Sequence, residues 1–204
     1  MSLSFYAEHF GLDGKSAVVL GGSTLPGRAV AEALGRAGAV CVIAGRSEAR
    51  GHGCVERIRS TAGQAGFWRT DLSSAESVEQ LLDYAVGEHG QVDLLVQIAA
   101  PTWDSAWMTA VERVFQRQLQ RQPEGGVMLG IVPHEFGEEV PEPLGLENVA
   151  RHRCVARFEQ SLWQSADASR QALRPCVALL LGLLAAGPSL ADGRWLWSSP
   201  HQAS

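Results

Sequence analysis

Short apolar segments alternate with amphipathic segments along the chain, and this alternation restricts the fold more than any other feature. Most of the apolar segments are continuous, as expected for strands that are buried on both faces of a parallel sheet. We therefore expect an α/β fold, a doubly wound parallel sheet of about seven strands with helices on both faces. The predicted strands are residues 16–22, 40–46, 65–73, 92–100, 126–133, 176–184 and 193–198, and the predicted helices are residues 28–39, 49–63, 74–90, 107–122 and 147–173.

Length and charge exclude several classes of protein. A chain of 204 residues without an internal repeat or a low-complexity linker is expected to form a single domain over residues 1–204. The net charge of −5 and the absence of a basic block argue against nucleic acid as a partner. The longest apolar run, residues 177–187, is too short to span a bilayer, and the first residues do not resemble a signal peptide. We expect a cytoplasmic protein without a membrane partner.

The four cysteines, Cys41, Cys54, Cys154 and Cys176, form no CxxC pair and have no metal-ligand spacing with histidine. Cys41 and Cys176 lie in apolar runs, where cysteine behaves as a small hydrophobic residue. We therefore expect four reduced structural thiols and no metal site.

Several motifs occur in an order and spacing that resemble the short-chain dehydrogenase/reductase family over nearly the whole chain. Residues 15–28 resemble its glycine-rich opening, and Arg46 stands where members select the substituent on the adenosine ribose. Asp71 begins a pair that resembles the one whose carboxylate meets the adenine. Residues 92–100 are similar to the Asn-Asn-Ala-Gly strand, and residues 190–197 to the last strand. The resemblance implies a Rossmann-like fold and NAD or NADP as cofactor.

The glycine-rich opening departs from the family pattern at its centre. Gly21 and Gly27 are retained, but Leu25 replaces the middle glycine, and its side chain would occupy space used by the phosphates or ribose. We interpret Gly21, Gly27, Arg46 and Asp71 as a degenerate remnant of a cofactor site and expect no cofactor on this chain.

The residues of hydride transfer are also replaced. The chemistry that the resemblance implies needs a tyrosine as general acid and a lysine one helical turn later, but the matching positions are Asn148 and His152. The family serine falls near His134. Lys15 is the only lysine in the chain, and Tyr6 and Tyr84 are its two tyrosines, all three remote from this segment by sequence order. We therefore predict no catalytic residues of the family type.

The helical substrate lid of the family is also expected to be absent. Only residues 185–189 separate the predicted strand at 176–184 from the segment that resembles the last strand. Such a short connection leaves no room for a lid, so a surviving site would be open.

Three functions remain open at this point. The favoured hypothesis is a non-catalytic subunit that pairs with a complete homologue carrying NAD or NADP, through residues 107–122 and 147–173 and the last strand with Trp195 and Trp197. A second hypothesis is a redox-neutral enzyme, a cyclase, dehydratase or isomerase, with His134 as base beside five glutamates between residues 135 and 147. A third is a nucleotide sensor that uses Arg46 and Asp71.

Overall fold

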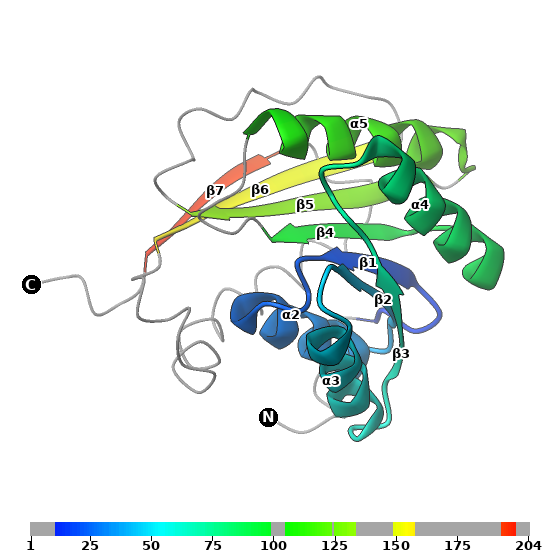
Figure 1. The fold of residues 1–204 in the computed structure, drawn as a ribbon. Coiled ribbons are helices and arrows are strands. Elements are labelled where there is room, and N and C mark those ends of the chain that lie inside the picture. Colours follow the sequence, from blue (N-terminus) through cyan, green and yellow to red (C-terminus); the bar gives the residue numbers. More distant parts are fainter. Residues whose placement is uncertain (1–10, 99–104, 124, 134–148, 158–192, 199–204) are drawn as a thin grey trace, which may run out of the picture.

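The computed structural model describes residues 11–98, 105–123, 125–133, 149–157 and 193–198, and these form one seven-stranded sheet with flanking helices (Figure 1). The strand order is β3-β2-β1-β4-β5-β6-β7, and every neighbouring pair is parallel. The elements are β1 (Ser16–Leu20), α2 (Leu25–Arg36), β2 (Val40–Gly45), α3 (Glu48–Arg59), β3 (Gln64–Arg69), α4 (Ala75–His89), β4 (Leu94–Ile98), α5 (Ser105–Arg121), β5 (Gly126–Pro133), β6 (Val149–Arg157) and β7 (Gly193–Ser198). The expected doubly wound parallel sheet is confirmed.

The two faces of the sheet carry different helices. Helices α2 and α3 cover one face, and α4 and α5 cover the other (Figure 1). Alternate residues of a strand serve the two cores: Val19 packs with Leu34 and Ile58 on the α2/α3 face, whereas Leu20 packs with Phe115 on the α4/α5 face. Burial on both faces explains why the strands are continuous apolar runs.

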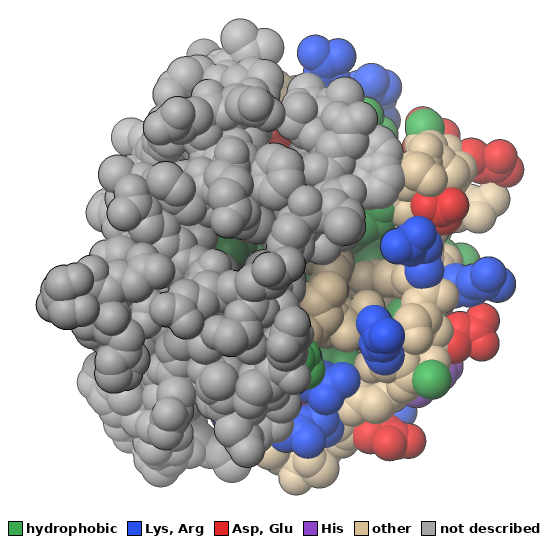
Figure 2. Space-filling model, turned by 60° about the vertical axis from the view of Figure 1, so that its left-hand side comes forward, with side chains coloured by type: hydrophobic (Ala, Val, Ile, Leu, Met, Phe, Trp, Pro, Cys, Tyr) green, Lys and Arg blue, Asp and Glu red, His purple; other side chains and the backbone are tan. Residues whose placement is uncertain are grey.

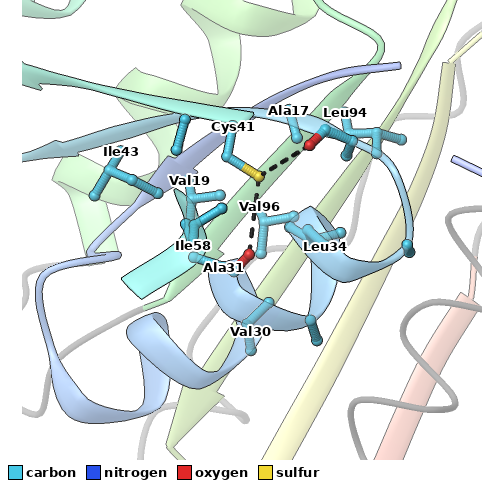
Figure 3. Close-up of a cluster of buried hydrophobic side chains, with 14 of the residues drawn as sticks. Ala17, Val19, Val30, Ala31, Leu34, Cys41, Ile43, Ile58, Leu94 and Val96 are labelled. Atoms are coloured by element: carbon cyan, nitrogen blue, oxygen red, sulfur yellow. Dashed lines mark hydrogen bonds between the residues drawn. The ribbon is translucent and has the colours of Figure 1, made fainter. Parts of the chain in front are cut away.

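Cys41 belongs to the core beneath α2, where its Sγ lies 3.8 Å from the carbonyl oxygens of Ala31 and Ala39 (Figure 3). Cys54, on α3, is also buried, and both residues are free thiols. Burial raises the pKa of each of these two thiols to about 12. The prediction of reduced structural cysteines is confirmed for these two residues. The side chain of Cys154 is not described, and Cys176 lies outside the described residues.

Helix α2 begins three residues earlier than the sequence predicted. Thr24 is its N-cap and accepts a hydrogen bond from the backbone N–H of Gly27 at 3.2 Å. Pro26 fits the first turn because no intrahelical acceptor is available there for a backbone N–H. Leu25 and Pro26 are therefore helical residues rather than part of a preceding loop.

The prediction of one long helix over residues 147–173 is wrong for residues 149–157. These residues form β6, which pairs with β5 from Val149 to Ala156 and with β7 from His152 onward. The local pattern did not decide the structure of this segment, because pairing with two neighbouring strands overrides local propensity. The remainder of that predicted helix, the predicted strand at 176–184 and the short connection at 185–189 lie outside the described residues.

The sequence also predicted no membrane-spanning segment and no basic block. Within the described residues no helix is long and apolar enough to cross a bilayer. The face drawn in Figure 2 carries positive and negative side chains interspersed with polar groups over the described part of the chain.

Candidate functional site

The carboxyl ends of the parallel strands meet at one edge of the sheet, and three of the four predicted cofactor residues follow those ends. Gly21 follows β1, Arg46 follows β2, and Asp71 comes two residues after β3. The strand order reverses between β1 and β4, and ligands of open α/β sheets bind in the crevice at such a switch point. The fold therefore brings these residues to the edge where a ligand site is expected.

A tight turn from Gly21 to Thr24 joins β1 to α2. Gly21 has φ +78°, a left-handed conformation that favours glycine. Its carbonyl oxygen accepts hydrogen bonds from the backbone N–H and the hydroxyl of Thr24, at 2.9 and 2.8 Å. Thr24 thus closes the turn and caps the helix.

Both retained glycines are required by the packing of this turn. A β-carbon on Gly21 would lie 2.6 Å from the carbonyl oxygen of Ile98, at the end of β4. A β-carbon on Gly27 would overlap the backbone of Gly21 and Gly22. Gly21 therefore allows the approach of β1 to β4, and Gly27 allows the approach of α2 to the turn.

The turn also presents backbone donors. The N–H groups of Gly22, Ser23 and Leu25 make no hydrogen bond to any described residue, and Pro26 has none to offer. Leu25 is half-buried as the first residue of α2. Unpaired N–H groups at a helix N-terminus attract anions, so this turn keeps donors of the kind that bind a phosphate.

Asp71 and Arg46 interact at the same edge. Hydrogen bonds from the hydroxyl and the backbone N–H of Ser73, at 2.7 and 3.0 Å, lower the pKa of the Asp71 carboxyl, and the Arg46 guanidinium lowers it further. Both Asp71 and Arg46 are exposed. An exposed carboxylate beside a guanidinium can contact a polar ligand. One oxygen of the Asp71 carboxylate, Oδ1, already accepts the two hydrogen bonds from Ser73.

Gln97 is a buried polar residue at the end of β4, where the resemblance expects an asparagine. It is 2% exposed, and its side-chain carbonyl oxygen has no hydrogen-bond partner among the described residues. Within the described part of the chain, the buried Nε of Arg28, near the start of α2, likewise has no partner. Sequence reasoning missed this feature of Arg28, because no motif signals an unpartnered Nε.

The candidate groups for proton transfer are not brought to this edge by the described residues. Lys15 precedes β1, at the opposite edge, and its Nζ lies 3.1 Å from Oδ1 of Asp93. Tyr84 stacks on Trp68 with ring centroids 4.3 Å apart. Tyr6, His134 and Asn148 lie outside the described residues.

His152 lies within β6 rather than on a helix, which corrects the predicted correspondence of residues 148 and 152 with a tyrosine and lysine one helical turn apart. The described residues also contain no group of three side chains able to hold a metal ion.

The sequence model of the short chain dehydrogenase family matches residues 15–128. The chain belongs to this family. The 7alpha-hydroxysteroid dehydrogenase of Escherichia coli (strain K12) is 32% identical over 95 residues, which are 47% of this chain and 37% of that relative. The short-chain dehydrogenase/reductase homolog YusS of Bacillus subtilis (strain 168) is 35% identical over 89 residues, 43% of this chain and 82% of that relative. The chain thus spans little more than a third of the Escherichia coli relative.

Solved structures of short chain dehydrogenases share the fold at low sequence identity. A short-chain type dehydrogenase/reductase from Mycobacterium marinum superposes with a TM-score of 0.75 at 17% identity, and the match covers 100% of both chains. A 7 alpha-hydroxysteroid dehydrogenase complexed with NADH and 7-oxo glycochenodeoxycholic acid gives a TM-score of 0.73 at 17% identity, covering 95% of this chain and 96% of the other.

Proposed function

We propose that this chain is a non-catalytic member of the short chain dehydrogenase family. In this proposal it pairs with a complete, NAD(P)-dependent homologue in a heteromeric alcohol or hydroxyacyl dehydrogenase or ketoreductase. The homologue supplies the cofactor and the catalytic residues, and this chain supplies the opposing subunit. The observation that carries the proposal is that Gly21 and Gly27 are retained where β1 leads into α2, whereas Leu25 stands at the position of the middle glycine.

The two retained glycines are those that the fold itself requires. Gly21 and Gly27 have no room for a β-carbon, so their retention needs no ligand to explain it. In dinucleotide-binding turns the middle glycine serves the close approach of the pyrophosphate to the backbone. Leu25 holds that place here, as an ordinary first residue of a helix. Loss of the ligand-specific glycine alone is the pattern expected when selection maintains the fold and not the cofactor.

The position of Lys15 supports the same proposal. Its ammonium pairs with Asp93 beside the amino ends of β1 and β4, whereas the family site lies at the carboxyl ends. Because Lys15 is the only lysine in the sequence, no other ammonium side chain can lower the pKa of a general acid at the site. The position of Lys15 thus supports a chain that does not itself carry out hydride transfer.

A titration of the isolated chain with NADH and NADPH tests the loss of cofactor binding. We expect no binding up to millimolar cofactor for the natural sequence, and the same for Leu25→Met, which keeps a side chain of similar volume. Leu25→Gly removes that side chain while the N–H groups of Gly22 and Ser23 remain available, so we expect it to bind measurably. Tight binding and turnover by the natural chain would contradict the proposal.

A nucleotide sensor is the second candidate, because Arg46, Asp71 and three N–H groups without an acceptor among the described residues lie around one sheet edge. The titration separates the two candidates: a sensor binds the cofactor without turnover, and Arg46→Gln weakens that binding. The redox-neutral enzyme rests on His134, outside the described residues, and stays a prediction that His134→Ala would test by loss of turnover.

A further inference from the structure

Strand β3 is the outermost strand of the described sheet, at the opposite edge from β7 (Figure 1). The backbone N–H of Thr70, just after the strand, donates to the carbonyl oxygen of Gly45 in β2 at 3.1 Å. Successive residues of a strand direct their backbone groups to alternate sides of the strand. Ala65, Phe67 and Arg69 therefore direct their N–H and C=O groups away from β2, toward the outside of the sheet.

Arg59, at the end of α3, covers only the first part of this edge. Its Nε and Nη2 donate to the carbonyl oxygen of Ala65 at 3.0 and 2.7 Å. Charged side chains in such places prevent unwanted pairing of an edge strand. Within the described part of the chain, the outward-facing groups of Phe67 and Arg69 have no comparable cover. The second half of β3 is therefore open to strand pairing.

Two guanidinium groups flank the open part of the edge. Both belong to the α3 side of the sheet: Arg59 lies on α3 itself, and Arg69 follows Ala65 and Phe67 at two-residue steps on the face that packs beneath α3. The two bonds to Ala65 use two of the five N–H donors of Arg59. Arg69 lies 4.0 Å from Glu48 in a strongly exposed pair, which contributes little. Both groups can therefore pair with carboxylates of a molecule at this edge.

Aromatic rings line both sides of the same edge. On the α3 side, the ring of Phe67 lies 5.1 Å from that of His52. On the α4 side, Trp68 stacks on Tyr84 with ring centroids 4.3 Å apart, and Gly66 beside them has no side chain. Phe67, Trp68 and Tyr84 are half-buried. A strand added here would bury more of these rings with its own apolar side chains.

A second copy of β3 is disfavoured as the added strand. A two-fold axis places the same surface of both copies face to face, so Arg59 and Arg69 of one copy would meet those of the other. Like charges set against each other across an interface cost several kcal/mol. The flanking charges therefore favour a different, acidic occupant.

We infer that the open edge of β3 binds an extended acidic segment of another protein by antiparallel strand addition. The segment has the order acidic, three apolar residues, acidic. Its carboxylates meet Arg59 and Arg69, and its middle residue exchanges backbone hydrogen bonds with Phe67. The inference goes beyond the proposed function, because the predicted subunit contact includes α5 and β7, toward the other edge of the sheet.

An NMR titration of the full chain with a synthetic peptide tests this site. The peptide is glutamate-valine-isoleucine-valine-glutamate between glycines, with blocked termini. We expect saturable shifts of the backbone amides of Phe67 and Arg69 and of the Trp68 indole. Two control peptides separate the contributions. One replaces both glutamates by lysine and should bind about tenfold more weakly or worse at low salt. The other is methylated on the backbone nitrogen of the isoleucine, which blocks pairing with Phe67, and should not bind.

A variant of one flanking arginine provides an independent measurement. We expect Arg69→Gln to weaken binding of the glutamate peptide by about twofold to fivefold, as the loss of one exposed ion pair predicts. The matched control is Arg117→Gln, which removes the same charge from an exposed position on α5 and should leave binding unchanged. Because Arg69 and Arg117 are both exposed, both variants should fold.

Four results would overturn the inference. They are no saturable shift with the glutamate peptide; shifts centred on another element; equal binding of either control peptide; and binding that Arg69→Gln leaves unchanged or that Arg117→Gln weakens as much. Each of them leaves the proposed function untouched, because that function is tested by cofactor titration and by the co-purified homologue.

Discussion

The ammonium of Lys15 and the carboxylate of Asp93 meet at 3.1 Å beside the amino ends of β1 and β4. Asp93 also accepts hydrogen bonds from the backbone N–H of Ser16 at 2.8 Å and from the Gln91 amide at 2.8 Å. Its side chain is buried, whereas that of Lys15 is 42% exposed. The one lysine of the chain therefore serves the start of the sheet, at the edge opposite the predicted cofactor site.

Replacing this carboxylate should destabilise the protein. Asp93→Asn leaves the N–H of Ser16 and the other donors facing a neutral amide, so we expect a loss of about 1–3 kcal/mol in the free energy of unfolding. Lys15→Met should cost less, about 0–1 kcal/mol, because the lysine is partly exposed. Urea unfolding of both variants measures the difference, and an equal loss would show that Asp93 acts only through Lys15.

The close packing of Gly27 against the backbone of Gly21 and Gly22 predicts that a larger residue there destabilises the protein. Gly27→Ala should destabilise the protein by about 1–3 kcal/mol or more, since its β-carbon would overlap the backbone of Gly21. Gly53→Ala is the matched control: Gly53 lies inside α3 with open space around it, so alanine should stabilise the protein by about 0.5–1 kcal/mol. Thermal unfolding distinguishes the two, and a neutral Gly27→Ala would remove the structural explanation for that glycine.

The buried thiols should be inert in the folded protein. With pKa values raised to about 12, Cys41 and Cys54 carry almost no thiolate at pH 8. We expect an alkylating reagent to label their peptides only after denaturant is added, as mass spectrometry of the digested protein can measure. Rapid labelling of Cys54 without denaturant would contradict the described packing of α3.

The same pKa values predict how stability changes at alkaline pH. The ordinary thiol pKa is about 9.0, so above that pH the unfolded chain loses these protons while the folded protein retains them. The contribution of the two thiols is fully present below pH 9 and decreases as the pH rises toward 12. Cys41→Ala should flatten this part of the pH profile, and an unchanged slope would count against burial as the cause.

The pKa of Asp71 should depend mainly on its hydrogen bonds from Ser73. Ser73→Ala removes the shorter of the two hydrogen bonds to the carboxylate, so the pKa of Asp71 should rise toward its ordinary value. Arg46→Gln should raise the pKa by less, because the charge contributes less than the hydrogen bonds. An NMR titration of the Asp71 side chain measures both shifts, and a larger effect of Arg46→Gln would reverse the assignment.

Most strands could be predicted because they are continuous apolar runs, as expected for strands that are buried on both faces of a sheet. Residues 126–133 are apolar throughout and form β5 with those bounds. The prediction failed for residues 149–157 because three consecutive polar residues, Arg151 to Arg153, interrupt the apolar run, and only pairing with β5 and β7 makes the segment a strand. Tertiary pairing of this kind cannot be derived from a local pattern.

The candidate site was predictable in its position but not in its contacts. Gly21, Arg46 and Asp71 each follow a predicted strand, and parallel strands end at one edge, so their common location follows from the order of elements. The close approach of Gly21 to Ile98, and a Gln97 side-chain carbonyl with no partner among the described residues, depend on distances between segments far apart in the chain. Such distances require the folded backbone.

Native mass spectrometry of the tagged protein, recovered from its own host, distinguishes a heteromeric subunit from a chain that associates only with itself. We expect a complex in which this chain is bound to a second, complete member of the short chain dehydrogenase family, with NAD or NADP on that second chain. A protein recovered only as copies of itself, or with the cofactor bound to this chain, would contradict it.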